Sequence, residues 1–285
     1  MTNYNMTPFL KIGHRGACGY EPENTLRSFK KALALGVDMI ELDIWLTKDN
    51  RIVVIHDITV NRTTNGKGRV DELTLEEIKK LDAGQGEAVP LLSEVMDLVK
   101  GRAQLNIEIK TKDVAERLIV ELKQSNFPLA DLLISSNYLE TIQYFKDQMP
   151  ELKVAWVFKA IENPPFYLKV IKWIFFILVF IRKIFPFLKL DWLYRSLTFP
   201  IGQLIWGMLM TGILPLTNFL IMDKLLSKKI DTICIYYFIV TKSLIKRIHK
   251  YDKKILIWTV DQPRLIKKLK RWGVDGIFCN YPDRL

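Results

Sequence analysis

Three carboxylates lie on two short apolar segments of the sequence. Glu41 and Asp43 alternate with apolar residues in the run 39–46, and Glu108 does the same in the run 105–110. Alternation at every second position predicts β-strands that project these carboxylates from one face. Converging carboxylates repel one another unless a cation lies between them, and ligation by oxygen alone favours Ca2+ or Mg2+ over zinc. The pattern therefore predicts one divalent metal ion, Ca2+ or Mg2+.

Two of the three histidines, His14 and His56, lie at the ends of predicted strands beside this acidic group. Histidine titrates near neutral pH, so such a pair can act as a general base and a general acid. A single histidine at a strand end is more typical of a structural role, but two beside three carboxylates indicate a catalytic site. The sequence leaves open which histidine is the base and which is the acid.

Two basic side chains accompany the same groups. Arg15 follows His14, and Lys110 shares a predicted strand face with Glu108. Cations, carboxylates and a metal ion in one place are reconciled by an anionic ligand, and a phosphodiester meets that requirement.

The segment after the first acidic strand predicts a hairpin instead of a helical crossover. Only residues 47–50 separate the run 39–46 from the run 52–56, which is too short for a parallel connection. With Asp49 and Asn50 as the two loop residues, Asp43 lies opposite His56, and cross-strand partners share a face. This register places His56 beside the carboxylates. The apolar residues expected on the other face are Ile44, Leu46, Val53 and Ile55.

Short apolar runs alternate with amphipathic stretches along the chain, which is typical of βαβ units around a parallel sheet. The 285 residues fit one α/β barrel, since that fold needs roughly 250 residues. The predicted fold class is α/β, a (β/α)8 TIM-type barrel formed by a single domain over 1–285, and capping signals predict helices that begin at Thr25 and Thr74. The eight expected strands are Phe9–Gly13, Met39–Leu46, Leu105–Lys110, Leu132–Ser136, Val154–Phe158, Thr232–Tyr237, Ile255–Val260 and Gly276–Cys279.

The chain carries a formal net charge of +11 at pH 7, which suggests an anionic partner such as nucleic acid or a lipid surface. No nucleic-acid-binding motif is recognised and the cations border apolar runs, so nucleic acid is not expected. The three cysteines are far apart and form no Cys-x-x-Cys pair, which argues against a structural zinc and a disulfide framework. Residues 1–10 lack a basic segment followed by an apolar one, so no secretory signal peptide is expected.

A series of short motifs runs through residues 9–158 and 230–285. They are His14-Arg15-Gly16, Pro22-Glu23-Asn24-Thr25, Glu41-Leu42-Asp43, Val53-Val54-Ile55-His56-Asp57, Arg62-Thr63-Thr64-Asn65-Gly66, Ile107-Glu108-Ile109-Lys110, Trp258-Thr259-Val260 and Gly273-Val274-Asp275-Gly276-Ile277. In residue type and order they resemble the glycerophosphodiester phosphodiesterase family.

This resemblance implies a TIM-type barrel that hydrolyses glycerophosphodiesters to an alcohol and glycerol 3-phosphate. The functional residues that it implies are the metal ligands Glu41, Asp43 and Glu108, the acid–base pair His14 and His56, the phosphate-binding Arg15 and Lys110, and the substrate-binding Glu23, Asn24 and Trp258.

Three segments depart from the family's pattern. Cys279-Asn280 stands where Thr-Asp is usual, Asn137 replaces an aromatic residue, and Ile-Cys-Ile-Tyr-Tyr-Phe occupies the place of a His-Asn-Pro-like segment near 232–238. None of these positions is expected to touch the metal or the two histidines. The departures are therefore expected to affect substrate selectivity more than chemistry.

Residues 160–228 form an apolar insertion that the motifs do not cover. Basic residues outnumber acidic ones eight to three there, and the longest charge-free run within 166–190 is 173–181, too short for a bilayer that needs about 20 residues. The segment 196–222 has no charge, but its prolines and glycines argue against one straight spanning helix. Apolar faces rimmed by Lys and Arg suit an anchor on anionic lipid. The expected membrane contacts are Trp173, Phe176, Trp192 and Trp206.

The insertion leaves the carboxyl end of the fifth predicted strand, the end at which barrel active sites lie. Membrane docking there would bring a lipid substrate within reach, such as a lysophospholipid that yields lysophosphatidic acid. The chain is accordingly expected at a membrane, on its cytoplasmic face. A buried helical layer, a dimer interface and a membrane-spanning hairpin are the alternative interpretations of 160–228.

The function that these patterns favour is metal-dependent hydrolysis of glycerophosphodiesters, with lysophospholipids as a further substrate class. One alternative is a phospholipase C- or sphingomyelinase D-like phosphodiesterase on a similar barrel, against which the Pro22–Thr25 and Trp258–Val260 motifs argue. Another is a membrane-bound lipid-binding module without catalysis, against which the intact set of carboxylates and histidines argues.

Overall fold

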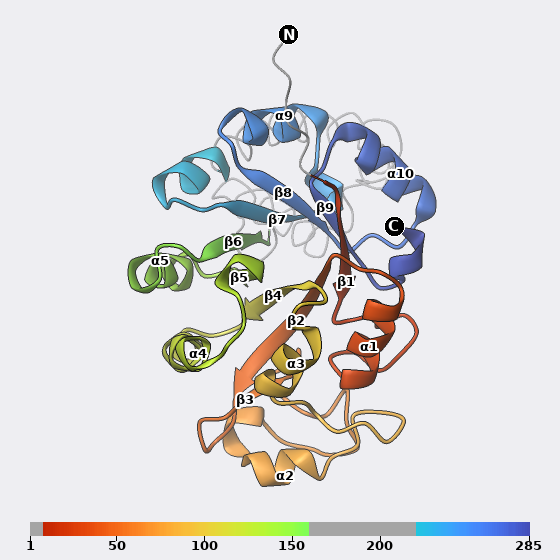
Figure 1. The fold of residues 1–285 in the computed structure, drawn as a ribbon, viewed down its shortest axis with the longest axis vertical. Coiled ribbons are helices and arrows are strands. Elements are labelled where there is room, and N and C mark those ends of the chain that lie inside the picture. The colour runs from red at the N-terminus through yellow and green to blue at the C-terminus, as the bar shows by residue number, and fades with distance from the viewer. Residues whose placement is uncertain (1–7, 160–220) are drawn as a thin grey trace, which may run out of the picture. The chain divides into compact units, whose positions relative to one another are not determined.

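The computed structural model describes residues 8–159 and 221–285 (Figure 1). The strands in these ranges are β1 (Leu10–His14), β2 (Met39–Leu46), β3 (Ile52–Val54), β4 (Gln104–Ile109), β5 (Leu132–Ser136), β6 (Lys153–Phe158), β7 (Thr232–Tyr236), β8 (Lys254–Trp258) and β9 (Gly276–Cys279). The α-helices that lie wholly in these ranges are α1 (Leu26–Ala34), α2 (Leu75–Lys79), α3 (Leu92–Val99), α4 (Asp113–Gln124), α5 (Leu139–Gln148), α9 (Lys242–Lys250) and α10 (Pro263–Trp272), and residues 221–227 are also helical.

These strands form a closed barrel with one antiparallel arm. The sheet order is β1-β9-β8-β7-β6-β5-β4-β2-β3, and an additional β1–β2 pairing closes it. Neighbouring barrel strands pair in parallel, whereas β3 pairs with β2 in antiparallel orientation. The predicted (β/α)8 TIM-type barrel is confirmed, and the predicted boundaries of β2, β5 and β9 match those observed.

Alternation along β2 separates the groups that face the barrel interior from those on the outer face. Met39 packs in an apolar core to which strands all around the barrel contribute. Glu41 and Asp43 follow at intervals of two, so they share its face nearer the carboxyl end of the strand. Ile40 and Leu42 are fully buried on the opposite face. The fold therefore places the two carboxylates at the mouth of the barrel, above an apolar interior.

Both predicted helix starts are observed, with Thr25 and Thr74 as the N-cap residues. Thr25 precedes α1, and its hydroxyl accepts a hydrogen bond from the Ser28 N–H at 3.2 Å. Thr74 and Glu77 form a capping box at the start of α2. Both caps satisfy N–H groups that lack a partner within the first helical turn.

The predicted hairpin register is wrong by one residue. Trp45 lies opposite Val53, so the loop between β2 and β3 holds three residues, 48–50, instead of two. The Asp49 carboxylate accepts hydrogen bonds inside this loop and from the start of α2, and Asn50 has a left-handed backbone with φ of 57°. A three-residue loop with a left-handed residue is a common hairpin connection, and this local hydrogen bonding selects it.

The corrected register gives Asp43 a different neighbour. The Ile55 N–H donates to the Asp43 carbonyl oxygen at 3.0 Å, so Ile55 and not His56 lies opposite Asp43. Ile55 packs in a second apolar cluster beside β3, apart from Ile44 and Leu46, so the predicted apolar surface does not form. His56 follows after the strand has ended.

The barrel is built from the chain up to Phe158 and from Leu225 onward. Residues between these limits correspond to the predicted apolar insertion, and almost all of them fall outside the described ranges. The four aromatic residues predicted to contact a membrane, Trp173, Phe176, Trp192 and Trp206, are among those outside. Among the residues that are described, no helix has the length and apolar character needed to cross a membrane.

We predict that Gly16→Ala destabilises the barrel more than Gly36→Ala. Both glycines have positive φ, 84° and 71°, so an alanine costs about 1–2 kcal/mol of backbone strain at either site. A Cβ atom at Gly16 would also lie 2.7 Å and 2.8 Å from the backbone carbon and oxygen of Ser28, whereas nothing lies within 4 Å at Gly36. Overpacking adds about 1–3 kcal/mol at Gly16. Urea unfolding midpoints measure the difference, and equal midpoints would contradict the contact.

Candidate active site

The turn after β1 fixes the first part of the site. Arg15 and Gly16 both have positive φ, 51° and 84°, so the chain reverses directly after His14. In this turn the Arg15 N–H donates to Glu41 Oε2 at 2.9 Å, and the Ser28 hydroxyl donates to the Arg15 carbonyl oxygen at 2.9 Å. The backbone of Arg15 thereby orients a carboxylate of the neighbouring strand, while its side chain is left to act separately.

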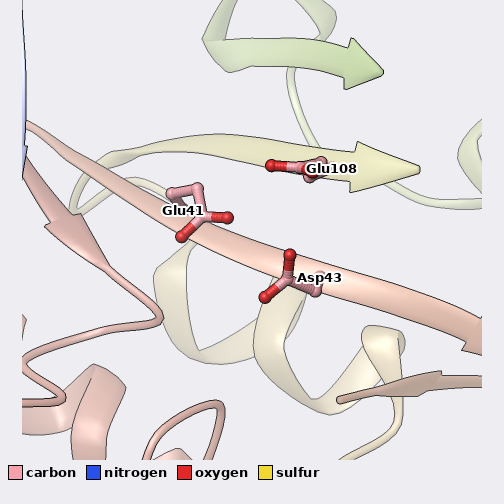
Figure 2. A group of neighbouring side chains, drawn as sticks. All are labelled: Glu41, Asp43 and Glu108. Carbon is pink, nitrogen blue, oxygen red and sulfur yellow. The ribbon is translucent and has the colours of Figure 1, made fainter. Parts of the chain in front are cut away.

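The three predicted metal ligands converge at the mouth of the barrel (Figure 2). Each of Glu41, Asp43 and Glu108 offers a carboxylate oxygen within 4.8 Å of the others. The pairing of β2 with β4 puts Asp43 directly beside Glu108, and alternation adds Glu41 on the same face. Glu41 and Asp43 are 3% and 1% exposed. The arrangement can chelate a single hard cation.

The charges around these carboxylates are unevenly shared. Burial and the neighbouring charges of Asp43 and Glu108 raise the pKa of Glu41 well above its usual range. Burial also disfavours the charged form of Asp43, but Lys110 Nζ at 2.7 Å and Arg15 Nε at 3.3 Å outweigh it and hold its pKa below the usual range. Asp43 is therefore compensated by two basic side chains, whereas the backbone N–H and the charge of Arg15 offset the repulsion at Glu41 only in part.

The two predicted phosphate-binding side chains, Lys110 and Arg15, lie beside the three carboxylates. Lys110 Nζ lies 2.5 Å from Glu108 Oε1, so it bridges two of the carboxylates. Burial lowers the pKa of Lys110, but Asp43 and Glu108 more than offset that effect and raise it. Both cations thus stay charged beside the cluster, where an anion could join them.

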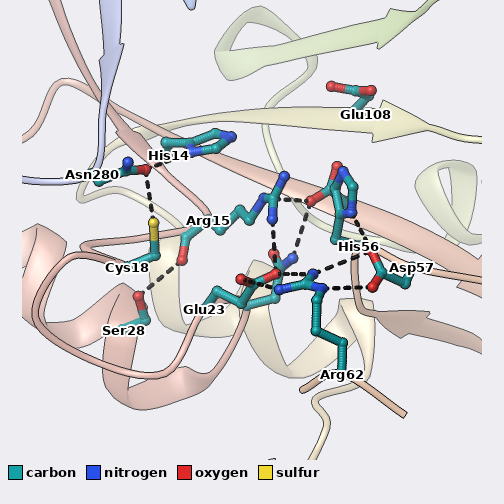
Figure 3. A network of polar contacts seen from close by, with 12 residues as sticks. His14, Arg15, Cys18, Glu23, Ser28, His56, Asp57, Arg62, Glu108 and Asn280 are labelled. Atoms are coloured by element: carbon teal, nitrogen blue, oxygen red, sulfur yellow. Dashed lines mark hydrogen bonds and ion pairs between the residues drawn. The ribbon is translucent and has the colours of Figure 1, made fainter. Parts of the chain in front are cut away.

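A chain of ion pairs connects Arg15 to His56 (Figure 3). Arg15 Nη1 lies 2.8 Å from Glu23 Oε1, and Glu23 receives Arg62 at 2.7 Å and 2.8 Å through both of its oxygens. Arg62 Nε lies 2.6 Å from Asp57 Oδ2, and Asp57 Oδ1 lies 2.6 Å from His56 Nδ1. The hydrogen bond from Arg62 lowers the pKa of Asp57 to about 2.

His56 reaches the site from beyond β3. Its backbone carbonyl accepts a hydrogen bond from the Trp45 indole N–H at 2.9 Å, and its Nδ1 is paired with Asp57. His56 is also close enough to help lower the pKa of Asp43, after the larger effects of Lys110 and Arg15. The predicted proximity of His56 to the carboxylates therefore holds, although the predicted register that led to it does not.

His14 contacts a residue that sequence reasoning placed elsewhere. Its Nδ1 lies 2.7 Å from Asn280 Oδ1, and its Nε2 lies 4.0 Å from Glu41 Oε2. Burial, followed by the charge of Arg15, lowers the pKa of His14. The expectation that the Cys279-Asn280 departure touches neither histidine is wrong, because β9 pairs with β1 and brings Asn280 beside His14.

The three predicted substrate-binding residues have different surroundings. Glu23 is engaged by two arginines, so it organises their guanidinium groups. Asn24, which is 3% exposed, donates from Nδ2 to Asp43 Oδ2 at 3.1 Å and so orients that carboxylate. Trp258 ends β8 and lies over the apolar interior of the barrel, with its ring centroid 5.3 Å from that of Tyr236.

Sequence reasoning gave no role to four residues that shape the site. Asp57 and Arg62 complete the ion-pair chain. On the other side of the site, Asn280 contacts His14 and is itself hydrogen-bonded to Asp261. Asp57 and Arg62 belong to two of the family-like motifs. The position of Asp57 directly after His56 could have indicated a partner for that histidine. Asp261 and Asn280 follow the neighbouring strands β8 and β9, and the pairing of these two strands brings them together.

The sequence is similar to those of known proteins. Residues 14–160 and 214–284 match the Glycerophosphoryl diester phosphodiesterase family. A glycerophosphodiester phosphodiesterase of Caldanaerobacter subterraneus subsp. tengcongensis is 33% identical over 290 residues, which cover 97% of this chain and 96% of that protein. A lysophospholipase D of Mus musculus is 36% identical over 115 residues, which cover 36% of each chain.

A solved structure shares the fold. The structure of an Oleispira antarctica phosphodiesterase, in complex with the product sn-glycerol-3-phosphate, aligns with a TM-score of 0.71 at 24% identity and covers 99% of this chain and 96% of that one. The family match spans both halves of the barrel and includes both histidines and all three carboxylates. The chain therefore belongs to the glycerophosphoryl diester phosphodiesterase family.

Proposed function

We propose that this protein hydrolyses glycerophosphodiesters to an alcohol and glycerol 3-phosphate with the help of one divalent cation. The observation that carries the proposal is the convergence of three carboxylates, flanked by two histidines and two basic side chains, at the mouth of the family's barrel. The product in the Oleispira antarctica complex, sn-glycerol-3-phosphate, supports the same substrate class.

The carboxylates fit a hard divalent cation. Their oxygens lie within 4.8 Å of one another, and the raised pKa of Glu41 reflects burial and like charges that a cation would relieve. An all-oxygen donor set suits Mg2+ or Ca2+. Glu41, Asp43 and Glu108 would hold the ion, and the ion would supply charge neutralisation at the phosphate oxygens.

The charges of the site suit a phosphodiester. Arg15 and Lys110 both lie within 3.3 Å of Asp43, so their remaining N–H groups are kept beside the acidic cluster. With a divalent cation present, these two side chains and the three carboxylates leave one positive charge. A phosphodiester carries one negative charge and would neutralise it. Arg15 can also bind two oxygens of the phosphate with its guanidinium group.

The two histidines would move the protons. One histidine removes the proton from a hydroxyl as its oxygen bonds to phosphorus, and the other gives a proton to the alcohol oxygen as the bond from phosphorus to that oxygen breaks. Water or the neighbouring glycerol hydroxyl can be the nucleophile. In the second case a cyclic phosphate forms as the alcohol leaves, and water then opens it with the roles of the histidines reversed: the one that gave a proton takes one from water, and the one that took a proton gives it to the glycerol oxygen.

Lysophospholipids are the finer substrate class that we propose. Two features support it: the basic, apolar composition of 160–228, and the exposed aromatic residues Tyr236 and Phe238 at the carboxyl end of β7, which are 40% and 60% exposed. The lysophospholipase D of Mus musculus is a partial relative. Docking on an anionic membrane surface would then present the substrate to the site.

We predict that the purified protein with Mg2+ or Ca2+ releases choline from glycerophosphocholine, and that His14→Ala and His56→Ala each lower kcat by about 10²–10⁴-fold, because each removes a proton-transfer group. Enzymatic detection of choline measures the rate. His249→Gln is the matched control, since His249 pairs with Asp275 outside this site, and it should keep the activity. Full activity in either alanine variant would refute the assigned roles.

We predict that Mg2+ or Ca2+ raises the thermal midpoint of the wild type, by the equivalent of about 2.7 kcal/mol when its concentration is 100 times the dissociation constant. Glu41→Gln should abolish the shift because it removes a ligand and its charge. Glu72→Gln is the control, since the Glu72 carboxylate is 70% exposed and pairs only loosely with Arg69. A midpoint shift that survives Glu41→Gln would place the cation elsewhere.

We predict that lysophosphatidylcholine is cleaved with a higher kcat/KM than glycerophosphocholine, and that the protein sediments with vesicles containing anionic phosphatidylglycerol. The double variant Trp173→Ala with Trp206→Ala should lose vesicle binding while it still cleaves glycerophosphocholine, because these residues are proposed to contact the membrane and are not among the proposed catalytic or metal-binding residues. A strong preference for the deacylated substrate would contradict the lipid proposal. Equal sedimentation of wild type and variant would contradict the assigned membrane contacts.

A further inference from the structure

Asn280 joins His14 to an acidic residue outside the metal cluster. Asn280 Oδ1 lies 2.7 Å from His14 Nδ1, while Asn280 Nδ2 donates to Asp261 Oδ2 at 2.7 Å and the Asn280 N–H donates to Asp261 Oδ1 at 2.8 Å. We propose that Asn280, held by Asp261, is a positioning residue that keeps His14 in the tautomer protonated at Nδ1. The consequence for catalysis rests on the function proposed above.

The orientation of the Asn280 amide follows from its partners. A carboxylate only accepts hydrogen bonds, so the NH2 end of the amide must face Asp261. The oxygen end then faces His14, and it also accepts from the Cys18 thiol, with a sulfur–oxygen distance of 2.9 Å (Figure 3). Rotation of the amide by half a turn would set an amide oxygen against the Asp261 carboxylate. Asp261 therefore fixes which end of Asn280 the histidine meets.

The orientation of the Asn280 amide determines which ring nitrogen of His14 carries the hydrogen. An amide oxygen only accepts, so Nδ1 must carry the hydrogen, and in the neutral ring Nε2 then bears the lone pair. Nε2 is the nitrogen that faces the acidic cluster, 4.0 Å from Glu41 Oε2. His14 thus presents a proton acceptor to the place where a nucleophile would lie.

The hydrogen-bond partner of His56 is a carboxylate instead of an amide. His56 Nδ1 is paired with the Asp57 carboxylate at 2.6 Å, and the same carboxylate accepts a hydrogen bond from Arg62. The amide oxygen that faces His14 carries no charge. The two histidines therefore have unlike partners, and the positioning that we propose concerns His14, whose Nε2 is set to take a proton from the nucleophile.

A purely structural role for Asn280 makes a different prediction. Asp261 and Asn280 follow β8 and β9, so their contact could merely tie two loops together. In that case loss of the contact would alter stability but not the position of a proton on a histidine ring. The tautomer of His14 separates the two roles, and it is measurable whether or not a substrate is known.

The direct test is ¹⁵N NMR of the full chain labelled at histidine, in the presence of Mg2+ and at a pH at which the rings are neutral. The chain has three histidines, so single His→Gln variants assign each ring. We expect His14 to show a protonated Nδ1 and an unprotonated Nε2. A wild-type His14 protonated at Nε2 would overturn the proposal, even if the protein is an active phosphodiesterase.

Variants of the pair give a second readout. Asn280→Leu keeps the branched shape of the side chain but removes the acceptor, and we expect kcat to fall about 10–100-fold with KM little changed, together with loss of the single tautomer. The exchange Asp261→Asn with Asn280→Asp restores an acceptor facing His14 Nδ1 and a donor facing residue 280. We expect it to recover the tautomer and most of kcat relative to Asn280→Leu.

Cys18→Ala is the matched control, because it removes the other hydrogen bond to Asn280 Oδ1 and leaves the one from His14. We expect it to keep both tautomer and kcat. An unchanged kcat in Asn280→Leu, or an exchange variant no better than Asn280→Leu, would refute the positioning role. If no glycerophosphodiester is cleaved by the wild type but the expected tautomer is observed and is lost in Asn280→Leu, the proposed function fails and the positioning role stands.

Discussion

The mutual repulsion of three carboxylates held in a barrel interior is the constraint on which the rest of the site depends. Glu41, Asp43 and Glu108 cannot move apart, because the pairing of two parallel strands sets their separation. Lys110 and Arg15 offset only part of the repulsion, since Lys110 pairs with Glu108 and Asp43 and the Arg15 side chain lies beside Asp43. Burial and the repulsion that is left raise the pKa of Glu41. A divalent cation would relieve this repulsion, which is the physical basis of the cation site proposed above.

The barrel supplies the two histidines by unlike routes, and this explains how they come to have unlike partners. His14 ends a barrel strand and is reached by the chain's last strand, so its partner is separated from it by 266 residues. His56 follows a short antiparallel arm, and its partner is the next residue in sequence. One histidine is therefore positioned by closure of the fold and the other by a local excursion from it.

Much of this arrangement could be predicted from sequence because its determinants are local. The period-two pattern of residues 39–46 located β2 and put Glu41 and Asp43 on one face, and the same pattern located Glu108. The hairpin register could not be predicted, because it depends on hydrogen bonds that Asp49 makes to the loop and to the start of α2. The contact of Asn280 with His14 depends on β9 pairing with β1, which no local pattern encodes. Arg62 belongs to one of the family-like motifs. Its bridge from Glu23 to Asp57 could not be predicted, because it depends on the positions of three side chains in the folded chain.

The turn at Arg15 separates two contributions of a single residue. Its backbone N–H orients Glu41, and any amino acid except proline would provide that donor. Its guanidinium group serves the acidic cluster and Glu23, and only an arginine provides that geometry. Because φ at this position is 51°, glycine would adopt the turn with less strain than arginine does. Sequence drift at position 15 would thus erode the proposed anion binding while the carboxylate scaffold survives, so a descendant of this protein could lose the proposed substrate and still keep the proposed cation site.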